Sequence, residues 1–477
     1  MRAFQTLTEL MPHQKAAVEK VKPTRVSALF MDMGTGKSRT VIELVKLRAN
    51  KIDHVVWVCP VSLKETVRYE ILKHTDCAEN DIFIFDGKVT DATVPLDRMW
   101  YIVGIESLSS SDRVTMALNS IITKKTFVIM DESSYIKGHT AKRTRRITKL
   151  SRRARYRTIL TGTPLSQGVV DLYSQMRFLS PKILGYHSFY SFACNHLEYH
   201  PDYPGLIVRA HNIPFIASKI KPYIYQCTKD ECMSLPSKLY KRYCTYLSMD
   251  QENEYAAAKM RFLDEMTKAE EQDKEISCIV IFKLFTELQT ICCGFIRQNE
   301  TEMSLINPRL DTLLTVAHDI PDGDKAIIWA KYIYAVKQIT SALRKEFGED
   351  SVAQYYGDLQ PEKRDKEIEK FMNSAKFLVA TQSCAGHGLN LQFCHYQIFY
   401  ANGFKYSERI QAEDRCHRHG QKRRVTYIDI HADKTIDDKI EDALYKKGDV
   451  VQSFRDEVER VKRDRGKEGL KELVMKL

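Results

Sequence analysis

The stretch Phe30-Met31-Asp32-Met33-Gly34-Thr35-Gly36-Lys37-Ser38 decides how the rest of the chain is interpreted. It follows a short apolar run, Val26 to Phe30, that is typical of a buried strand, and it opens a helical pattern from Thr40 to Leu47. A strand, a glycine loop and a helix in this order form the setting of a phosphate-binding loop. The glycines let backbone N–H groups converge on phosphate oxygens, and the new helix contributes its positive end.

The side chains of this loop have separate chemical roles. Lys37 can reach the β- and γ-phosphates of a nucleoside triphosphate, and Ser38 can hold Mg²⁺. The full pattern G-x-x-x-x-G-K-[ST] would place glycine at position 31, where this chain has Met31. Taken alone, the stretch is therefore also compatible with a Gly-Lys-Ser turn that binds nothing. We expect the phosphates to be held by Met33, Gly34, Thr35, Gly36, Lys37 and Ser38.

A second stretch, Phe127-Val-Ile-Met-Asp131-Glu132, supports the phosphate-binding interpretation. Four apolar residues predict a buried strand, and two acids follow at its carboxyl end, the edge where ligands bind in open α/β sheets. One carboxylate there can order Mg²⁺, and a second can polarise an attacking water. We assign Asp131, with Ser38, to the metal and Glu132 to the general base.

A third stretch, Gln411 to Gln421, is predicted to be a helix that Gly420 ends. In such a helix Gln411, Arg415 and Arg418 would lie on one face. A stripe of arginines is usually a solvated helix face. Here apolar runs on both sides indicate a second sheet domain, so the arginines could instead reach a γ-phosphate and stabilise its transition state.

Length and composition limit the protein class. The chain has 477 residues, enough for two or three domains, and 43% of them are hydrophobic. No apolar run reaches the length of a membrane span, and the N-terminus lacks a signal-peptide core. We therefore expect a soluble, cytoplasmic protein with no membrane partner. The 12 cysteines show no repeated C-x-x-C, so free thiols are favoured over a zinc site built from Cys227, Cys232, Cys292 and Cys293.

The formal net charge is +11, and part of it is concentrated between Lys137 and Arg157, where basic residues occur without any acid. A like-charge block of this density indicates an anionic partner such as nucleic acid. The alternative is a solvated helix face whose charge is balanced by distant acids.

Apolar runs alternate with amphipathic segments in both halves of the chain, the pattern of parallel α/β sheets. We predict an α/β fold of two doubly wound parallel-sheet domains in tandem, with a helical insertion between them. The expected boundaries are residues 1–165 for the ATP-binding domain, 166–305 for the insertion and linker, 306–445 for the second domain, and 446–477 for a C-terminal helical tail.

Taken in order, the blocks resemble those of superfamily-two helicases, and more narrowly the Swi/Snf-type DNA translocases. The resemblance runs from about residue 8 to residue 450. It rests on Leu10-Met-Pro-His-Gln14, Asp32 to Ser38, Asp131-Glu-Ser-Ser134, Leu160-Thr-Gly-Thr-Pro164-Leu, Val379 to Leu391 and Gln411 to Gln421. The family's acidic-Met-Gly-x-Gly-Lys loop explains why the first glycine is missing here.

The resemblance implies an ATPase whose nucleotide binds between two RecA-like domains. It implies that Gln14 holds the adenine and that Arg415 and Arg418 act as arginine fingers. Further nucleotide contacts are expected from Gly388, Asn390 and Gln411. The residues expected to bind nucleic acid are Lys64, Ser107, Lys137, Thr163, Thr381 and Gly386.

Some positions depart from the family pattern. Ser134 replaces a frequent histidine, Tyr225-Gln-Cys227 replaces paired arginines, and Gly403-Phe-Lys-Tyr406 replaces Trp-Asn-Pro. The chain therefore looks most like short phage or bacterial members. We expect ATP and Mg²⁺ as cofactors, double-stranded DNA as partner, and a monomer or transient oligomer. The alternatives are a strand-separating or branch-migrating helicase on DNA or RNA, and a non-hydrolysing nucleic-acid-binding scaffold.

Overall fold

The computed structural model describes residues 3–162, 164, 168–199, 207–271, 278–298, 301–385, 389–446 and 450–477. The chain divides into two compact units, residues 1–234 and 235–477. Thr163, Gly386 and Gly388, to which the sequence analysis gave roles, lie outside the described residues.

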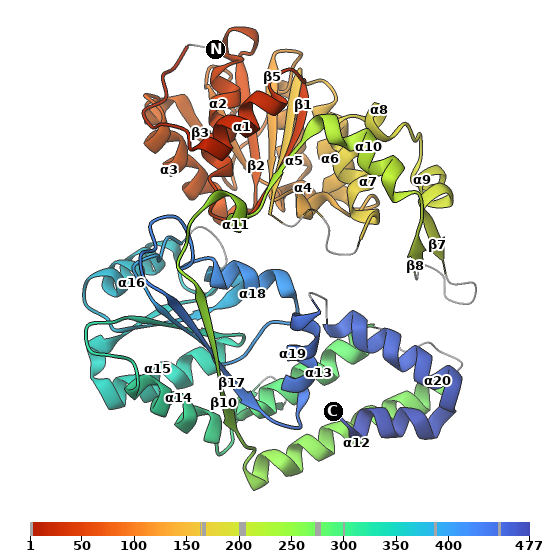
Figure 1. Cartoon of the computed structure of the whole chain (residues 1–477), viewed down its shortest axis with the longest axis vertical. Coiled ribbons are helices and arrows are strands. Elements are labelled where there is room, and N and C mark those ends of the chain that lie inside the picture. The colour runs from red at the N-terminus through yellow and green to blue at the C-terminus, as the bar shows by residue number, and fades with distance from the viewer. Residues whose placement is uncertain are drawn as a thin grey trace. The chain divides into compact units, whose positions relative to one another are not determined.

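The first unit is built on a seven-stranded sheet whose neighbouring strands are all parallel (Figure 1). Its runs of apolar residues match the predicted strands, and β1 is buried along its whole length. The order is β3 (Ile82–Ile84), β4 (Trp100–Gly104), β2 (His54–Cys59), β5 (Thr126–Asp131), β6 (Tyr156–Thr161), β1 (Val26–Met31) and β9 (Ile224–Cys227).

Helices cover both faces of this sheet. The side chains of β1 alternate between the hydrophobic cores on the two faces of the sheet. Ala28 and Phe30 pack in one core, and Leu29 and Met31 pack in the other. The helices are α1 (Pro12–Val21), α2 (Lys37–Lys46), α3 (Lys64–His74), α4 (Ser107–Ser110), α5 (Asp112–Ile121), α6 (Lys142–Ser151), α7 (Val170–Leu179), α8 (Pro181–Leu184), α9 (Phe189–His196), α10 (Ile213–Ile220) and α11 (Lys229–Cys232), and the hairpin β7 (Leu197–Tyr199)–β8 (Ile207–Ala210) follows α9.

The second unit contains a six-stranded sheet, again with parallel neighbours throughout. Its order is β10 (Lys238–Thr245), β17 (Val425–Ala432), β16 (Tyr396–Phe399), β13 (Ala326–Ala330), β15 (Phe377–Thr381) and β14 (Val352–Tyr355). Around it lie α14 (Pro308–His318), α15 (Ile333–Phe347), α16 (Pro361–Asn373), α17 (Gln382–Ala385), α18 (Tyr406–Glu413) and α19 (Ile436–Tyr445), with a small hairpin of β11 (Phe295–Gln298) and β12 (Thr301–Ser304). Two doubly wound parallel sheets in tandem confirm the predicted fold class.

Three long helices form a bundle at one end of the second unit (Figure 1). They are α12 (Met249–Glu271), α13 (Cys278–Cys292) and α20 (Val450–Met475), which come from distant parts of the sequence. The Tyr255 hydroxyl donates to the Leu477 carbonyl at 2.8 Å and accepts from the Ile436 N–H at 2.7 Å, so α12 holds the C-terminal end and the start of α19 together. No described helix is both long enough and apolar enough to span a bilayer.

The structure divides the chain once, between Ser234 and Leu235, where the sequence analysis expected a separate insertion from 166 to 305. The first part of that segment belongs to the first unit and the rest to the second. The strands described in this segment were not predicted, and two of them join the large sheets: β9 extends the first sheet beside β1, and β10 extends the second beside β17. β10 mixes lysines and tyrosines on a largely exposed edge, so it lacks the apolar run by which the other strands were found.

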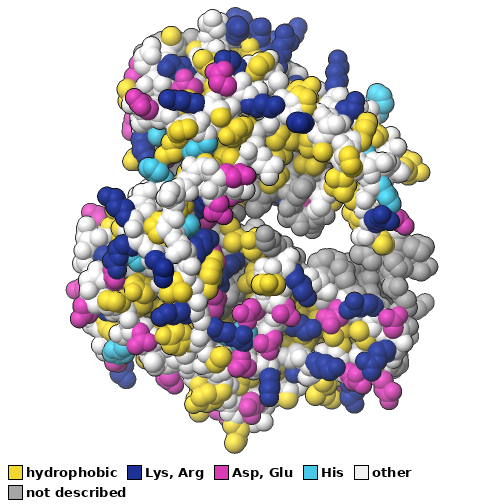
Figure 2. All heavy atoms as spheres, in the orientation of Figure 1, with side chains coloured by type: hydrophobic (Ala, Val, Ile, Leu, Met, Phe, Trp, Pro, Cys, Tyr) yellow, Lys and Arg dark blue, Asp and Glu magenta, His cyan; other side chains and the backbone are white. Residues whose placement is uncertain are grey.

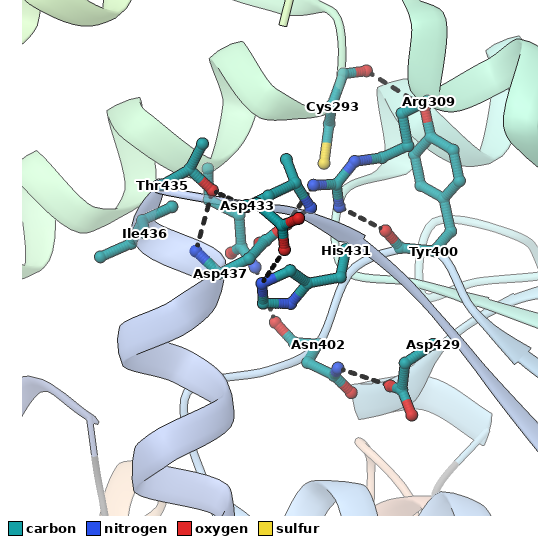
Figure 3. A network of polar contacts seen from close by, with 12 residues as sticks. Cys293, Arg309, Tyr400, Asn402, Asp429, His431, Asp433, Thr435, Ile436 and Asp437 are labelled. Carbon is teal, nitrogen blue, oxygen red and sulfur yellow. Dashed lines mark hydrogen bonds and ion pairs between the residues drawn. The ribbon is translucent and has the colours of Figure 1, made fainter. Parts of the chain in front are cut away.

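A buried ion pair ties α14 to the start of α19 (Figure 3). Arg309 is 1% exposed, it donates to the Tyr400 carbonyl at 2.7 Å, and it pairs with Asp437. Burial lowers the pKa of Arg309, but the charge of Asp437 outweighs this and raises it above the ordinary value. Arg309 therefore stays charged inside the unit.

Arg309→Leu should destabilise the second unit by about 3–5 kcal/mol, because it leaves Asp437 buried without its counter-charge. Arg297→Leu is the control, since its ion pair with Glu302 is exposed and should contribute less than about 1 kcal/mol. Hydrogen exchange of β16 and β17 measures the change, and equal protection in the two variants would contradict the assignment.

Candidate functional site

The phosphate-binding loop of the first unit runs from Asp32 to Gly36 between the carboxyl end of β1 and the first turn of α2. Gly34 and Gly36 have φ angles of 78° and 82°, which side chains with a Cβ rarely adopt. Met31 is the last residue of the buried strand, so the missing motif glycine falls where the backbone is ordinary β structure. Ser38 lies in the first turn of α2 and is partly buried.

The lysine of the loop is folded back onto loop carbonyls. Lys37 Nζ donates to the carbonyls of Met31 at 2.9 Å and Asp32 at 3.1 Å, and the Thr35 hydroxyl also donates to Asp32 at 2.7 Å. A phosphate offers the same ammonium a stronger, charge-assisted hydrogen bond. The loop therefore has a defined conformation without a ligand, and its lysine is held by hydrogen bonds to loop carbonyls.

Two residues of α1 form hydrogen bonds to the phosphate-binding loop. His13 Nε2 bonds the Thr35 carbonyl at 2.8 Å, and Gln14 Nε2 donates to the same carbonyl at 3.1 Å. A Cβ at Gly36 would also meet the Gln14 amide, which would have to move to make room for it. The Gln14 side chain thus lies beside the loop, and its adenine contact stays a prediction. His13 was not identified from the sequence.

The two acids lie together at the end of β5. Asp131 Oδ2 accepts a hydrogen bond from Trp57 Nε1 at 3.2 Å, and its other oxygen accepts from the Glu132 N–H at 3.0 Å. Glu132 is buried and has a left-handed φ of 50°. Such backbone strain in a non-glycine residue is concentrated at functional sites.

Two hydroxyls orient the Glu132 carboxylate. Ser134 Oγ donates to its Oε1 at 2.7 Å, and Thr161 Oγ1 donates to the same oxygen at 3.1 Å. Ser134, which departs from the family's histidine, therefore contacts the expected base directly. The sequence analysis gave this role to neither residue. The Thr161 contact could not be found from the sequence, because it joins the end of β5 to the end of β6.

The charge balance of this site is unfavourable without a cation. Burial and the neighbouring Glu132 charge raise the pKa of Asp131 to about 6, although Lys37 opposes the shift. A carboxylate with the Ser38 hydroxyl, from the first turn of α2, is a donor set of hard oxygens, the type that Mg²⁺ prefers. The residues thus fit a magnesium ion, which would neutralise phosphate charge when bound.

The arginines of the second unit do not lie on the predicted helix. α18 ends at Glu413, and residues 414–420 form turns, so the expected stripe along Gln411, Arg415 and Arg418 was wrong. At the end of the helix, side chains of the sheet also bond the Glu413 carbonyl: Gln397 Nε2 donates to it at 3.0 Å and Tyr427 OH at 3.3 Å.

The turns nevertheless bring the two arginines together. Arg415 Nη1 and Arg418 Nη1 both donate to the Leu389 carbonyl, at 3.4 and 3.3 Å. Arg415 Nε also donates to the Gln411 carbonyl at 3.0 Å. Burial and the charge of Arg418 lower the pKa of Arg415 to about 10, so an anion beside this pair would relieve the repulsion. Asn390, in the same region, is exposed.

The residues expected to contact nucleic acid differ in their burial and in their bonding partners within the protein. Lys64 Nζ donates to the Phe85 carbonyl at 2.8 Å, and Ser107 opens α4. Thr381 is the buried last residue of β15. Lys137 forms an ion pair at 3.2 Å with the buried Asp171. The nucleic-acid roles of these residues stay predictions.

Much of the basic block also has partners inside the protein. Arg143 donates to the Tyr135 carbonyl, Arg146 to the Leu108 and Ser111 carbonyls, and Arg153 to the side chain and carbonyl of Asn119. An exposed stripe on and just after α6 carries Arg145, Lys149 and Arg152.

Figure 2 shows basic side chains interspersed with acidic ones on the visible face of the second unit.

A further polar cluster lies at the end of β17 in the second unit (Figure 3). His431, Asp433 and Asp438 are close enough to share a metal ion. Arg242 of β10, however, pairs with Asp433 at 2.6 Å and with Glu441 at 3.2 Å. A guanidinium already balances these carboxylates, so we interpret the cluster as an ion-pair network.

Comparison with family models matches an SNF2-related domain over residues 16–295 and a helicase conserved C-terminal domain over residues 308–420. The chain belongs to the SNF2-related family of superfamily-two ATPases. The phosphate-binding loop and both acids of the first unit fall in the first match, and the two arginines fall in the second.

Relatives agree with this assignment. YwqA of Bacillus subtilis, whose name describes an ATP-dependent helicase/translocase, is 26% identical over 94% of this chain. An "Uncharacterized ATP-dependent helicase" of Mycoplasma pneumoniae is 25% identical over 69%. The chain spans 48% and 31% of those two proteins. A solved structure, the Sulfolobus solfataricus SWI2/SNF2 ATPase core in complex with dsDNA, aligns over 98% of both chains with 22% identity and a TM-score of 0.43.

Asp131→Asn should stabilise the nucleotide-free protein at pH 8 by about 1–3 kcal/mol, because it removes a charge that is buried beside Glu132. The raised pKa means that the folded state keeps the Asp131 proton up to about pH 6, whereas the unfolded state loses it near pH 4. The wild-type carboxylate therefore costs stability progressively between these pH values and fully above them.

Urea unfolding of the nucleotide-free protein at pH 4, 6 and 8 measures this effect. The gain should be close to zero at pH 4 and largest at pH 8. Asp91→Asn, at an exposed aspartate, serves as the control and should change little at any pH. A gain that does not depend on pH would contradict the electrostatic explanation.

Proposed function

We propose that this chain is an ATP-dependent motor that hydrolyses ATP on binding nucleic acid and tracks along double-stranded DNA. The observation that carries the proposal is the assembly at the carboxyl edge of the first sheet. There a preformed phosphate loop with Lys37 lies beside Asp131, and Glu132 is held by two hydroxyls. This is the set of groups that phosphoryl transfer to water requires.

The chemistry follows from the contacts in the first unit. The loop N–H groups and Lys37 bind the β- and γ-phosphates. Ser38 and Asp131 would hold a magnesium ion, which would supply positive charge to offset that of the phosphates. Glu132 accepts a proton from the attacking water, and the Ser134 and Thr161 hydroxyls fix the direction of its carboxylate. Arg415 and Arg418 act as the arginine fingers, a role that their mutual repulsion in the absence of an anion supports.

The nucleic-acid part of the proposal rests on family membership and on the names of relatives that are helicases or translocases. The exposed stripe of Arg145, Lys149 and Arg152 on the first unit provides positive charge that the fold does not bury. Phosphate contacts of this kind are independent of sequence, as a tracking motor needs.

A non-hydrolysing scaffold is disfavoured by the same geometry. A scaffold would have no need to keep Glu132 in a strained conformation with two hydroxyls directed at it. Strand separation on DNA or RNA uses the same nucleotide groups, so only the polynucleotide preference distinguishes it from translocation.

The experiment that tests the function compares ATP turnover in the presence of duplex DNA, single-stranded DNA and RNA. We expect duplex DNA to stimulate most, and we expect the protein to displace a triplex-forming strand without separating the duplex. Stimulation by single strands or RNA alone would overturn the duplex assignment. An absence of turnover with every polynucleotide would favour the scaffold.

Glu132→Gln should lower nucleic-acid-stimulated turnover by at least about 10²-fold, because the amide cannot accept the water's proton. Lys37→Ala and Arg418→Ala should have comparable or larger effects, about 10³-fold or more for the arginine. Single-turnover hydrolysis measures each rate, and circular dichroism checks the fold. Glu9→Gln, at an exposed glutamate, is the control; normal turnover in Glu132→Gln would remove the base assignment.

A further inference from the structure

The strand β10 is the first strand of the second unit after the division at Ser234–Leu235, and it contacts the segment that carries the two arginines. The Pro236 carbonyl, just before the strand, is 2.8 Å from His417 Nε2. Within the strand, Lys238 and Tyr240 both reach Glu413. The segment that connects the two units is thus joined to the arginine turn by side-chain contacts.

Glu413 is the centre of these contacts. It is the last residue of α18 and is 3% exposed. Its Oε2 accepts hydrogen bonds from Lys238 Nζ and Tyr240 OH, both at 2.9 Å, and its Oε1 accepts from Arg409 Nε at 2.9 Å. Two elements that are distant in sequence therefore hold one buried carboxylate.

The same residue begins the turn that follows. The Glu413 carbonyl accepts from the N–H groups of Cys416 and His417, both at 3.3 Å. Arg415 lies between Glu413 and these donors, and Arg418 follows directly after them. Because these turns are anchored to one carbonyl, a shift of Glu413 would change the direction of both arginines.

Charge explains why Lys238 matters to this anchor. Arg409 is shared, since it also pairs with Asp429 and donates to Asn402 Oδ1 at 3.0 Å. One guanidinium thus serves two acids, and Lys238 supplies the second positive charge. Burial raises the pKa of Glu413, but the charges of Arg409 and Lys238 outweigh it and hold that pKa below the ordinary value. Without Lys238 the cluster would keep an uncompensated negative charge in a buried place.

We propose that Lys238 and Tyr240 are positioning residues for the arginine pair: through Glu413 they hold the turn so that Arg415 and Arg418 keep the orientation that hydrolysis requires. On this proposal β10 contributes to ATP hydrolysis, although it contacts no substrate. The inference rests on the proposed function, because it takes the arginine-finger role as given.

Lys238→Met should lower the turnover number of the nucleic-acid-stimulated ATPase about tenfold, while KM for ATP and the affinity for DNA change less than about twofold. Lys238→Arg keeps the charge and should recover most of the rate. The matched control is Lys241→Met, which removes an exposed lysine from the same strand and should leave the turnover number unchanged. Equal losses in Lys238→Met and Lys241→Met would overturn the proposal.

A double-mutant cycle shows whether Lys238 acts through the arginines. In an Arg418→Ala background, single-turnover hydrolysis should fall by much less on adding Lys238→Met than it does in the wild type. A loss of the same fold in both backgrounds would place the effect elsewhere and would overturn the inference. If Arg418→Ala itself hydrolyses ATP normally, the arginine-finger assignment fails, which is a separate result from normal turnover in Lys238→Met.

Tyr240→Phe provides a second variant that does not change the charge. It removes one hydrogen bond to Glu413 from a side chain whose ring stays stacked on Tyr427. We expect a loss of turnover number of about two- to fivefold with an unchanged melting temperature. Tyr240→Phe carries the test if Lys238→Met fails to fold, and a wild-type turnover number in this variant would then count against the proposal.

Discussion

The repulsion between two adjacent carboxylates at the end of β5 is the constraint on which the first unit's function depends. Trp57 bonds Asp131, the hydroxyls of Ser134 and Thr161 bond Glu132, and Lys37 opposes the charge of Asp131. A fold selected for stability alone would separate or neutralise two such groups. Their retention, together with the strained backbone of Glu132, is typical of a functional site.

The second unit contains the opposite arrangement. Arg415 and Arg418 direct their guanidinium groups at one backbone carbonyl, and their mutual repulsion adds to the cost of burial. The first unit thus holds an excess of negative charge at its catalytic edge, and the second holds an excess of positive charge in its turn. Each unit therefore has a local charge excess that a ligand of opposite charge would relieve. Binding of such a ligand would gain free energy from electrostatic stress that is already present in that unit.

The sequence was sufficient to locate the sheets and the phosphate loop, because buried parallel strands leave continuous apolar runs. Every run predicted in the two sheet domains became a strand in the structure, as at β1, β5 and β13. The edge strand β10 has no such run and was missed. The end of α18 was also misplaced, since no glycine or proline marks it. Side chains from β16 and β17 bond the Glu413 carbonyl where that helix ends, and long-range contacts of this kind leave no local signal.

Charge counting overstated the nucleic-acid surface for a related reason. The block from Lys137 to Arg157 is basic in sequence, yet Lys137, Arg143, Arg146 and Arg153 are used to hold loops and helix ends of the first unit. Arginine donates several hydrogen bonds in a fixed geometry, so it serves well as an internal brace between carbonyls. Sequence composition cannot distinguish basic side chains that form bonds within the protein from basic side chains that are exposed to a nucleic acid. The structure leaves a shorter exposed stripe as the surface that nucleic acid could use.

The segment between β9 and β10 connects these two electrostatic centres through bonds at each of its ends. At its start, the Asp32 N–H of the phosphate loop donates to the Cys227 carbonyl at 3.2 Å, and the Lys229 N–H donates to Asp32 Oδ2 at 3.0 Å. At its far end, Pro236 bonds His417 of the arginine turn. A rearrangement of the phosphate loop on binding a nucleotide would therefore act on one end of a short segment whose other end is attached to the arginines. The chain that joins the two units is therefore bonded near one end to the phosphate-binding loop and near the other end to the turn that carries the two arginines.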